Sequence, residues 1–146
     1  MNNPLLTKVF VTPFDRIEAG HVEPAIDLLI ERTQDAVDEI IERAELSYDA
    51  TLGALDEATD VLEWAAGVVG HLEAVATTDE LRAAYLVIQP KLSKFWSGIT
   101  LNEPLYRLLK DYSHSDAAAT LDSVHQRHLT KTLDGFRRSG AELDEA

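Results

Sequence analysis

The sequence has 146 residues, of which 45% are hydrophobic and 27% charged, and this composition is typical of one globular domain. Its 26 acidic and 13 basic residues give a formal net charge of −13, which repels phosphate backbones and argues against a nucleic-acid partner. Cysteine is absent, which excludes disulfides, cysteine-ligated zinc, iron–sulfur clusters and thiol nucleophiles. No apolar run has the length of a signal peptide or a membrane span, so we expect no membrane partner.

Residues 1–20 predict an extended N-terminal arm. Pro4 and Pro13 lie within this segment, Gly20 closes it, and its large apolar residues follow no helical period. These apolar side chains need a surface to dock on. That surface is supplied either by residues 21–146 or by another molecule.

Residues 21–146 predict an all-α domain, an antiparallel bundle of four long helices and one short helix. Apolar residues recur with helical spacing over 22–44 and 50–76, and the short connections favour antiparallel neighbours. Pro24 is expected in the first turn of the first helix, where proline is tolerated. Gly67 and Gly70 interrupt the second helix and indicate close packing or a bend.

The third helix is expected to begin near Thr78. Thr77 is the expected N-cap of a capping box, with Glu80 at the third helical position. The apolar phase continues through Pro90, which predicts one kinked helix instead of two.

Two more helices complete the expected bundle. Asn102 can cap a short helix that runs through Tyr112. A last helix is expected over 117–138, with Val124 on its apolar stripe and Ser139-Gly140 at its end.

The five histidines do not have the spacing of known catalytic metal sites. A zinc peptidase helix needs His-Glu-x-x-His, and the best partial match, at His71, lacks both the second histidine and the glutamate. A di-iron bundle needs two Glu-x-x-His pairs, and only the pair of Glu18 and His21 fits. Phosphate-binding glycine motifs and the Gly-x-Ser-x-Gly motif are also absent. We therefore predict no catalytic, cofactor-binding or metal-binding residue in this chain.

The histidines have two interpretations. His125 and His128 could jointly hold one metal ion, or they could be partly buried histidines that hydrogen-bond to neighbours. His71 is expected to be a packed histidine. His21 is expected at the entrance to the first helix, where it can order the arm.

Several short stretches together resemble one family. They stand in the order and at the approximate spacing of the thimet oligopeptidase family of zinc metallopeptidases, most closely its bacterial oligopeptidase A branch, and they cover essentially the whole chain. The stretches are Asn3-Pro4-Leu5-Leu6, Pro13-Phe14-Asp15-Arg16-Ile17, Gly20-His21-Val22-Glu23-Pro24-Ala25-Ile26, His71-Leu72, Glu80-Leu81-Arg82-Ala83-Ala84-Tyr85, Leu105-Tyr106 and Phe136-Arg137-Arg138-Ser139-Gly140.

The resemblance implies a part of a peptidase and not a whole one. Members of the family are several times longer, and their zinc-binding His-Glu-x-x-His helix lies beyond the point that corresponds to Ala146. The chain is thus expected to be an N-terminal piece or a truncated product that helps to build the channel wall of a cytoplasmic oligopeptidase. The remaining catalytic domain would be its partner and would hold the zinc, and short peptides would be bound by the complete enzyme. The chain alone is expected to be inactive.

Two alternatives stay open. The chain can be a free-standing helical interaction module whose arm docks on a partner or on a second copy. Exposed apolar surface makes a homodimer conceivable under either interpretation. A third hypothesis is a helical carrier of a metal or small ligand that uses His125 and His128.

Overall fold

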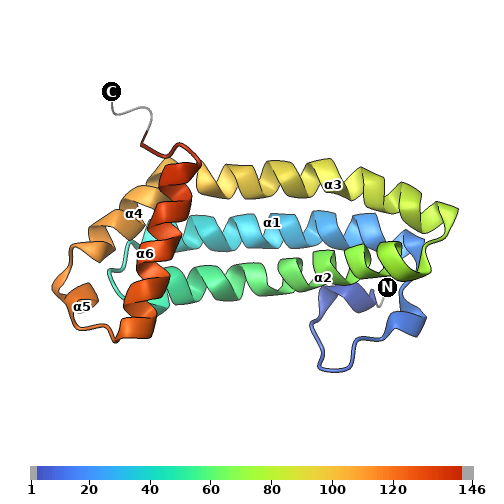
Figure 1. Ribbon diagram of the computed structural model, residues 1–146, viewed down its shortest axis with the longest axis horizontal. Helices are drawn as coiled ribbons and strands as arrows, with labels where there is room; N and C mark the ends of the chain where they lie inside the picture. The colour runs from blue at the N-terminus through green and yellow to red at the C-terminus, as the bar shows by residue number, and fades with distance from the viewer. Residues whose placement is uncertain (1–2, 143–146) are drawn as a thin grey trace. The chain divides into compact units, whose positions relative to one another are not determined.

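The computed structural model describes residues 3–142, and all of its regular structure there is helical, which confirms the all-α class. Figure 1 traces the helices in chain order. They are α1 (Ala19–Arg43), α2 (Ala54–Ala76), α3 (Asp79–Thr100), α4 (Glu103–Ser113), α5 (Asp116–Ala119) and α6 (Ser123–Arg138). Two 3₁₀ turns, η1 (Pro4–Leu6) and η2 (Phe14–Arg16), lie in the arm, and a π-helical turn, η3 (Asp49–Gly53), leads into α2. None of the described helices is both long enough and apolar enough to cross a membrane.

The chain forms two compact units, each built from separate stretches of sequence. The first unit contains the chain up to Gln34 together with Ala58–Lys94, and the second contains Asp35–Glu57 together with the chain from Phe95 onward. Each of the three long helices therefore contributes residues to both units.

In the first unit, α1, α2 and α3 contact one another through side chains on facing sides. Fully buried apolar residues make its interior: Leu5, Val22, Ala25, Ile26, Leu62, Ala65, Val69 and Ile88. Thr33 in α1 donates from Oγ1 to the carbonyl oxygen of Ala58 in α2, at 3.1 Å. Lys91 in α3 lies 2.7 Å from carboxylate oxygens of both Glu23 and Asp27 in α1. These contacts fix the three helix segments against each other.

In the second unit, α4 packs against η3, α5 and α6. Leu105, Leu109 and Tyr112 lie on the buried face of α4. The Asn102 side chain accepts a hydrogen bond from the N–H of Leu105 at 2.9 Å, which confirms the predicted cap. The amphipathic pattern of this short helix thus places it at the centre of the unit.

The arm folds back on the start of α1. Asn3 donates from Nδ2 to the carbonyl oxygen of His21 at 2.8 Å, and Leu5 is fully buried. The N–H of Glu18 donates to Nδ1 of His21 at 3.1 Å, which confirms that His21 orders the arm. Part of the arm is therefore docked on its own unit.

The predicted start of the first helix and the predicted N-cap of the third helix are wrong, whereas the third helix begins where it was expected. α1 begins at Ala19, so Pro24 lies within the helix and not in its first turn. Gly20 does not break it, because a glycine is tolerated in a helix at a cost of about 1 kcal/mol. The N-cap of α3 is Thr78 and not Thr77, because the N–H of Leu81 donates to the Thr78 hydroxyl at 3.1 Å. Hydrogen bonds from its own backbone N–H and from the Thr78 hydroxyl lower the pKa of the Glu80 carboxyl.

The predicted last helix is two helices. α5 ends at Ala119, and α6 begins at Ser123 after a break. The Asp122 carboxylate caps α6 by accepting from the N–H groups of Val124 and His125, both at 2.9 Å. Because the break changes the helical phase, Val124 is 72% exposed and the prediction that it faces inward is wrong.

Gly67 and Gly70 lie within an unbroken α2 and have no common packing role. A Cβ at Gly67 would meet no neighbouring atom within 4 Å, so close packing does not explain this glycine. A Cβ at Gly70 would lie 3.9 Å from the Tyr85 ring in α3, which is an ordinary contact. Pro90 lies inside α3, and the prediction of one helix through this proline is confirmed.

Candidate functional site

Four titratable side chains surround Tyr48 in the second unit, and we call this group the Tyr48 cluster. The Tyr48 hydroxyl lies 2.7 Å from Nδ1 of His128, whose Nε2 lies 3.6 Å from a carboxylate oxygen of Asp56. The ring of His125 meets the Tyr48 ring edge-on at a centroid distance of 4.4 Å. Nδ1 of His125 lies 2.8 Å from Oδ2 of Asp122. The structure thus brings both predicted histidines together, beside a tyrosine that the sequence analysis did not select.

The Tyr48 hydrogen bond and the nearby Asp56 carboxylate favour one tautomer of His128. A proton on Nε2 faces the Asp56 carboxylate, and Nδ1 then accepts from the Tyr48 hydroxyl. Burial and the negative charge of Asp56, Asp122 and Asp49 raise the pKa of Tyr48, so it stays a neutral phenol at pH 7. A neutral phenol is the hydrogen-bond donor that this arrangement needs.

The histidines and aspartates of the Tyr48 cluster are not arranged to hold a metal ion together. Across residues 3–142, no group of three or more histidine, aspartate or glutamate side chains is arranged to hold a metal ion. Nδ1 of His125 already pairs with Asp122, and backbone and side-chain hydrogen bonds from His125 lower the pKa of that carboxyl. The contacts favour the second interpretation of this pair: partly buried histidines that hydrogen-bond to neighbours and attach α6 to residues 48–56.

His71 lies apart from this cluster. It is exposed near the end of α2, and its ring lies 5.8 Å from the Phe14 ring, centroid to centroid. The prediction of a packed histidine is wrong because this stretch of α2 lies near a helix end, where the side chain of His71 points to solvent.

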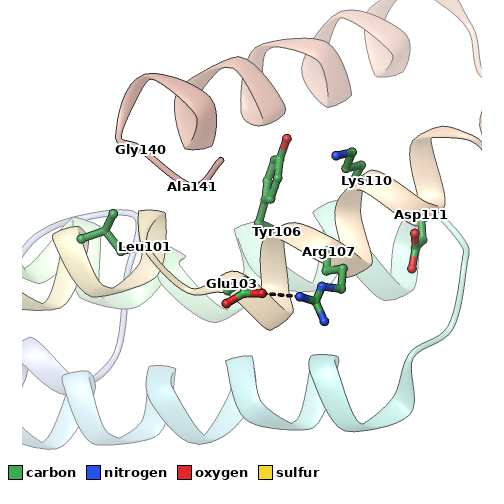
Figure 2. Close-up of a pocket in the computed structure, with 8 residues that line it drawn as sticks. All are labelled: Leu101, Glu103, Tyr106, Arg107, Lys110, Asp111, Gly140 and Ala141. Carbon is green, nitrogen blue, oxygen red and sulfur yellow. Dashed lines mark hydrogen bonds and ion pairs between the residues drawn. The ribbon is translucent and has the colours of Figure 1, made fainter. Parts of the chain in front are cut away.

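The second candidate site is a cavity of about 570 Å³ between α4 and the turn that follows α6 (Figure 2). In Figure 2, Tyr106 and Lys110 point from α4 toward Gly140 and Ala141, whereas Arg107 lies on the other side and pairs with Glu103. Tyr106 is buried and stacks on Phe136 with ring centroids 5.8 Å apart.

The carboxylate of Glu142, in the same turn, contacts two of the side chains that line this cavity, Tyr106 and Lys110. The Tyr106 hydroxyl donates to Oε1 of Glu142. The same oxygen lies 3.7 Å from Nζ of Lys110 and 3.5 Å from Nε of Arg137. The hydrogen bond from Tyr106, reinforced by the two cations, lowers the pKa of the Glu142 carboxyl. The contacts attach the end of α6 to α4; Tyr106 and Arg137 belong to stretches that carry the family resemblance, but their contact through Glu142 was not predicted.

Comparison with known proteins assigns this chain to a family. Residues 26–146 match the N-terminal domain of neurolysin and thimet oligopeptidase. The chain belongs to the neurolysin/thimet oligopeptidase family. The resemblance found in the sequence is thereby confirmed.

Named relatives match nearly the whole of this chain but only a small part of their own length. Oligopeptidase A of Salmonella typhimurium is 33% identical over 144 residues, which are 98% of this chain and 21% of that protein. Oligopeptidase A of Escherichia coli is 31% identical over 98% of this chain and 21% of that protein. The "Probable cytosolic oligopeptidase A" of Arabidopsis thaliana is 30% identical over 99% of this chain and 20% of that protein. The chain therefore spans about a fifth of the length of these relatives.

Proposed function

We propose that this chain is the non-catalytic N-terminal helical domain of a zinc-dependent oligopeptidase and forms part of the wall of its substrate channel. One observation carries the proposal: the chain matches the N-terminal domain of the family over residues 26–146 and spans about a fifth of each oligopeptidase A. A domain of this size and position supplies a scaffold, and the remainder of the polypeptide supplies the chemistry.

The residues of this chain do not fit a catalytic zinc centre. The 146-residue sequence contains no His-Glu-x-x-His, and residues 3–142 offer no cluster of ligands for a metal. The zinc ligands of the proposed enzyme would therefore belong to the part of the relatives that this chain does not match. The Tyr48 cluster and the Glu142 contacts serve to hold helices in place.

The proposed task of the domain is physical. A wall of packed helices beside a zinc centre admits short peptides and keeps folded proteins away from the reacting atoms. The partners of this chain are then the catalytic part of the enzyme and, through the complete enzyme, short peptides. We place this enzyme in the cytoplasm; of two Arabidopsis thaliana relatives, one is named cytosolic and the other organellar.

A chimera tests the proposal. The matching fifth of Escherichia coli oligopeptidase A is replaced by this chain, and hydrolysis of short peptides is measured with zinc present. We expect activity from the chimera and none from the 146-residue chain alone. Peptide hydrolysis by the pure chain, or a folded chimera without activity, would contradict the proposal.

A free-standing interaction module is the second candidate, and the exposed apolar residues of the arm favour it. Val9, Phe10 and Val11 are all exposed, as expected of a segment that docks on a partner. DNA sequence downstream of codon 146 separates the candidates: a continuing reading frame with a His-Glu-x-x-His motif supports the peptidase, and an immediate stop codon supports the module.

A further inference from the structure

The arm presents a short apolar loop that its own unit leaves uncovered. We call residues 9–14 the apolar loop; their sequence is Val-Phe-Val-Thr-Pro-Phe, without a charged side chain. The side chain of Phe10 is fully exposed, that of Val11 is 78% exposed, and those of Val9 and Phe14 are 42% and 45% exposed. The surface of a soluble protein rarely exposes four neighbouring apolar residues, and such a patch is typical of a surface that contacts another protein part.

The apolar loop is held in place at both of its ends. Before it, Leu5 is buried, and Nζ of Lys8 lies 2.5 Å from Oδ1 of Asp60 in α2. At its far end, the Phe14 ring contacts the His71 ring in α2, with centroids 5.8 Å apart, and the Phe14 N–H closes a local turn within the loop by donating to the carbonyl oxygen of Thr12 at 2.9 Å. A loop fixed in this way loses little conformational freedom when it binds, which favours its use as an anchor.

The length of the relatives offers an occupant for the loop. The relatives align with 98–99% of this chain, so the aligned region includes the loop, while about four-fifths of their own length lies outside it. A second copy is a poor occupant, because two chains of net charge −13 repel each other.

We propose that the apolar loop docks into an apolar pocket on the remaining part of the oligopeptidase polypeptide, with Phe10 as the anchor. This inference rests on the proposed function and adds the interface residues to it. Phe10 is the central residue of the loop and the most exposed, so its burial removes the largest apolar area from water.

Thiol labelling tests the docking. Because the chain has no cysteine, Phe10→Cys introduces its single thiol, and Glu31→Cys on the exposed side of α1 is the matched control. Maleimide labelling of each position is followed by mass spectrometry, in the 146-residue chain and in the chimera with Escherichia coli oligopeptidase A. We expect labelling at position 10 to slow at least about tenfold in the chimera, as a pocket that excludes the reagent requires, and labelling at position 31 to stay within about twofold. An equal rate at position 10 in both proteins would overturn the proposal.

Peptide hydrolysis by the same chimera separates this inference from the proposed function. An active chimera with an unprotected position 10 overturns the docking alone. An inactive, folded chimera with a protected position 10 supports the docking and contradicts the proposed function. An inactive, folded chimera with an unprotected position 10 overturns both.

A second variant covers a chimera that does not tolerate the cysteine. Phe10→Ser should leave the unfolding temperature of the 146-residue chain unchanged, because the side chain is exposed there, and lower that of the chimera by roughly 2 °C or more. Equal effects in the two proteins overturn the proposal. Sedimentation of the 146-residue chain tests the competing occupant: a dimer that Phe10→Ser disperses would assign the loop to a second copy and overturn the proposal.

Discussion

The hydroxyl of Tyr48 lies 2.7 Å from Nδ1 of His128, although 80 residues separate the two along the chain. This hydrogen bond joins the segment before η3 to α6 within the second unit. We expect Tyr48→Phe to lower the free energy of unfolding by about 1 kcal/mol, the usual contribution of such a bond. A double-mutant cycle with His128→Ala, measured by urea unfolding, should give a coupling energy of similar size. Additive effects of the two substitutions would show that this hydrogen bond contributes nothing to stability.

The Glu142 carboxyl should make stability depend on pH. Its pKa in the folded protein lies below the ordinary value of 4.5, first because Tyr106 donates to it and then because Lys110 and Arg137 are close. A lowered folded-state pKa stabilises the protein above the unfolded-state value, and this stabilisation disappears as the pH falls through the folded-state value. Glu142→Gln removes the titrating group, so its free energy of unfolding should fall less than that of the unchanged protein between about pH 5 and about pH 3. Tyr106→Phe removes the main cause of the shift and should flatten the curve as well. Identical pH profiles for Glu142→Gln and the unchanged protein would contradict this explanation.

Ala44 should be better replaced by glycine. It follows the last residue of α1 and has a φ of 49°, in the left-handed region that costs an L-residue about 1 kcal/mol. Ala44→Gly should therefore raise the free energy of unfolding by up to about 1 kcal/mol, despite the greater freedom of glycine in the unfolded chain. Ala83→Gly, at an exposed position within α3, is the control and should lower it by about 1 kcal/mol. If both variants lose stability equally, the conformation at Ala44 has no energetic cost.

Gly67 should be better replaced by alanine. It lies within α2, and an added Cβ meets open space, so Gly67→Ala should raise the free energy of unfolding by about 1 kcal/mol. Gly140, which follows α6, has a φ of 101°. Gly140→Ala should therefore lower the free energy of unfolding by about 1 kcal/mol. Thermal unfolding should show opposite shifts for the two variants. A loss of stability in Gly67→Ala would reveal a packing role that the open space around this residue does not provide.

Local chemistry made part of the fold predictable. Asn102 stands directly before an amphipathic segment, and its cap could be read from the sequence because donor and acceptor are three residues apart. Thr77 and Thr78 each carry a hydroxyl that can cap a helix, so only the backbone geometry decides which of them caps α3. The sequence pattern does not reveal the break before α6, although Asp122 is a good N-cap, because apolar residues at helical spacing stand on both sides of it.

Long-range contacts lay outside the reach of sequence patterns. The histidines at positions 125 and 128 stood out by their spacing, but nothing near them in the sequence pointed to Tyr48 as their neighbour. Tyr106 and Glu142 meet across 36 residues in the same way. The prediction that the apolar residues of the arm need a surface is confirmed for Leu5, which is buried. Phe10 is exposed, so by the same reasoning we expect a partner to cover it.

The second unit joins Asp35–Glu57 to residues that begin only at Phe95. After a ribosome has added Tyr48, it must add 80 more residues before His128, the hydrogen-bond partner of Tyr48, is present. During synthesis, the segment from Asp35 to Glu57 therefore emerges without its final neighbours, and this half of the fold closes only after α6 has left the exit tunnel.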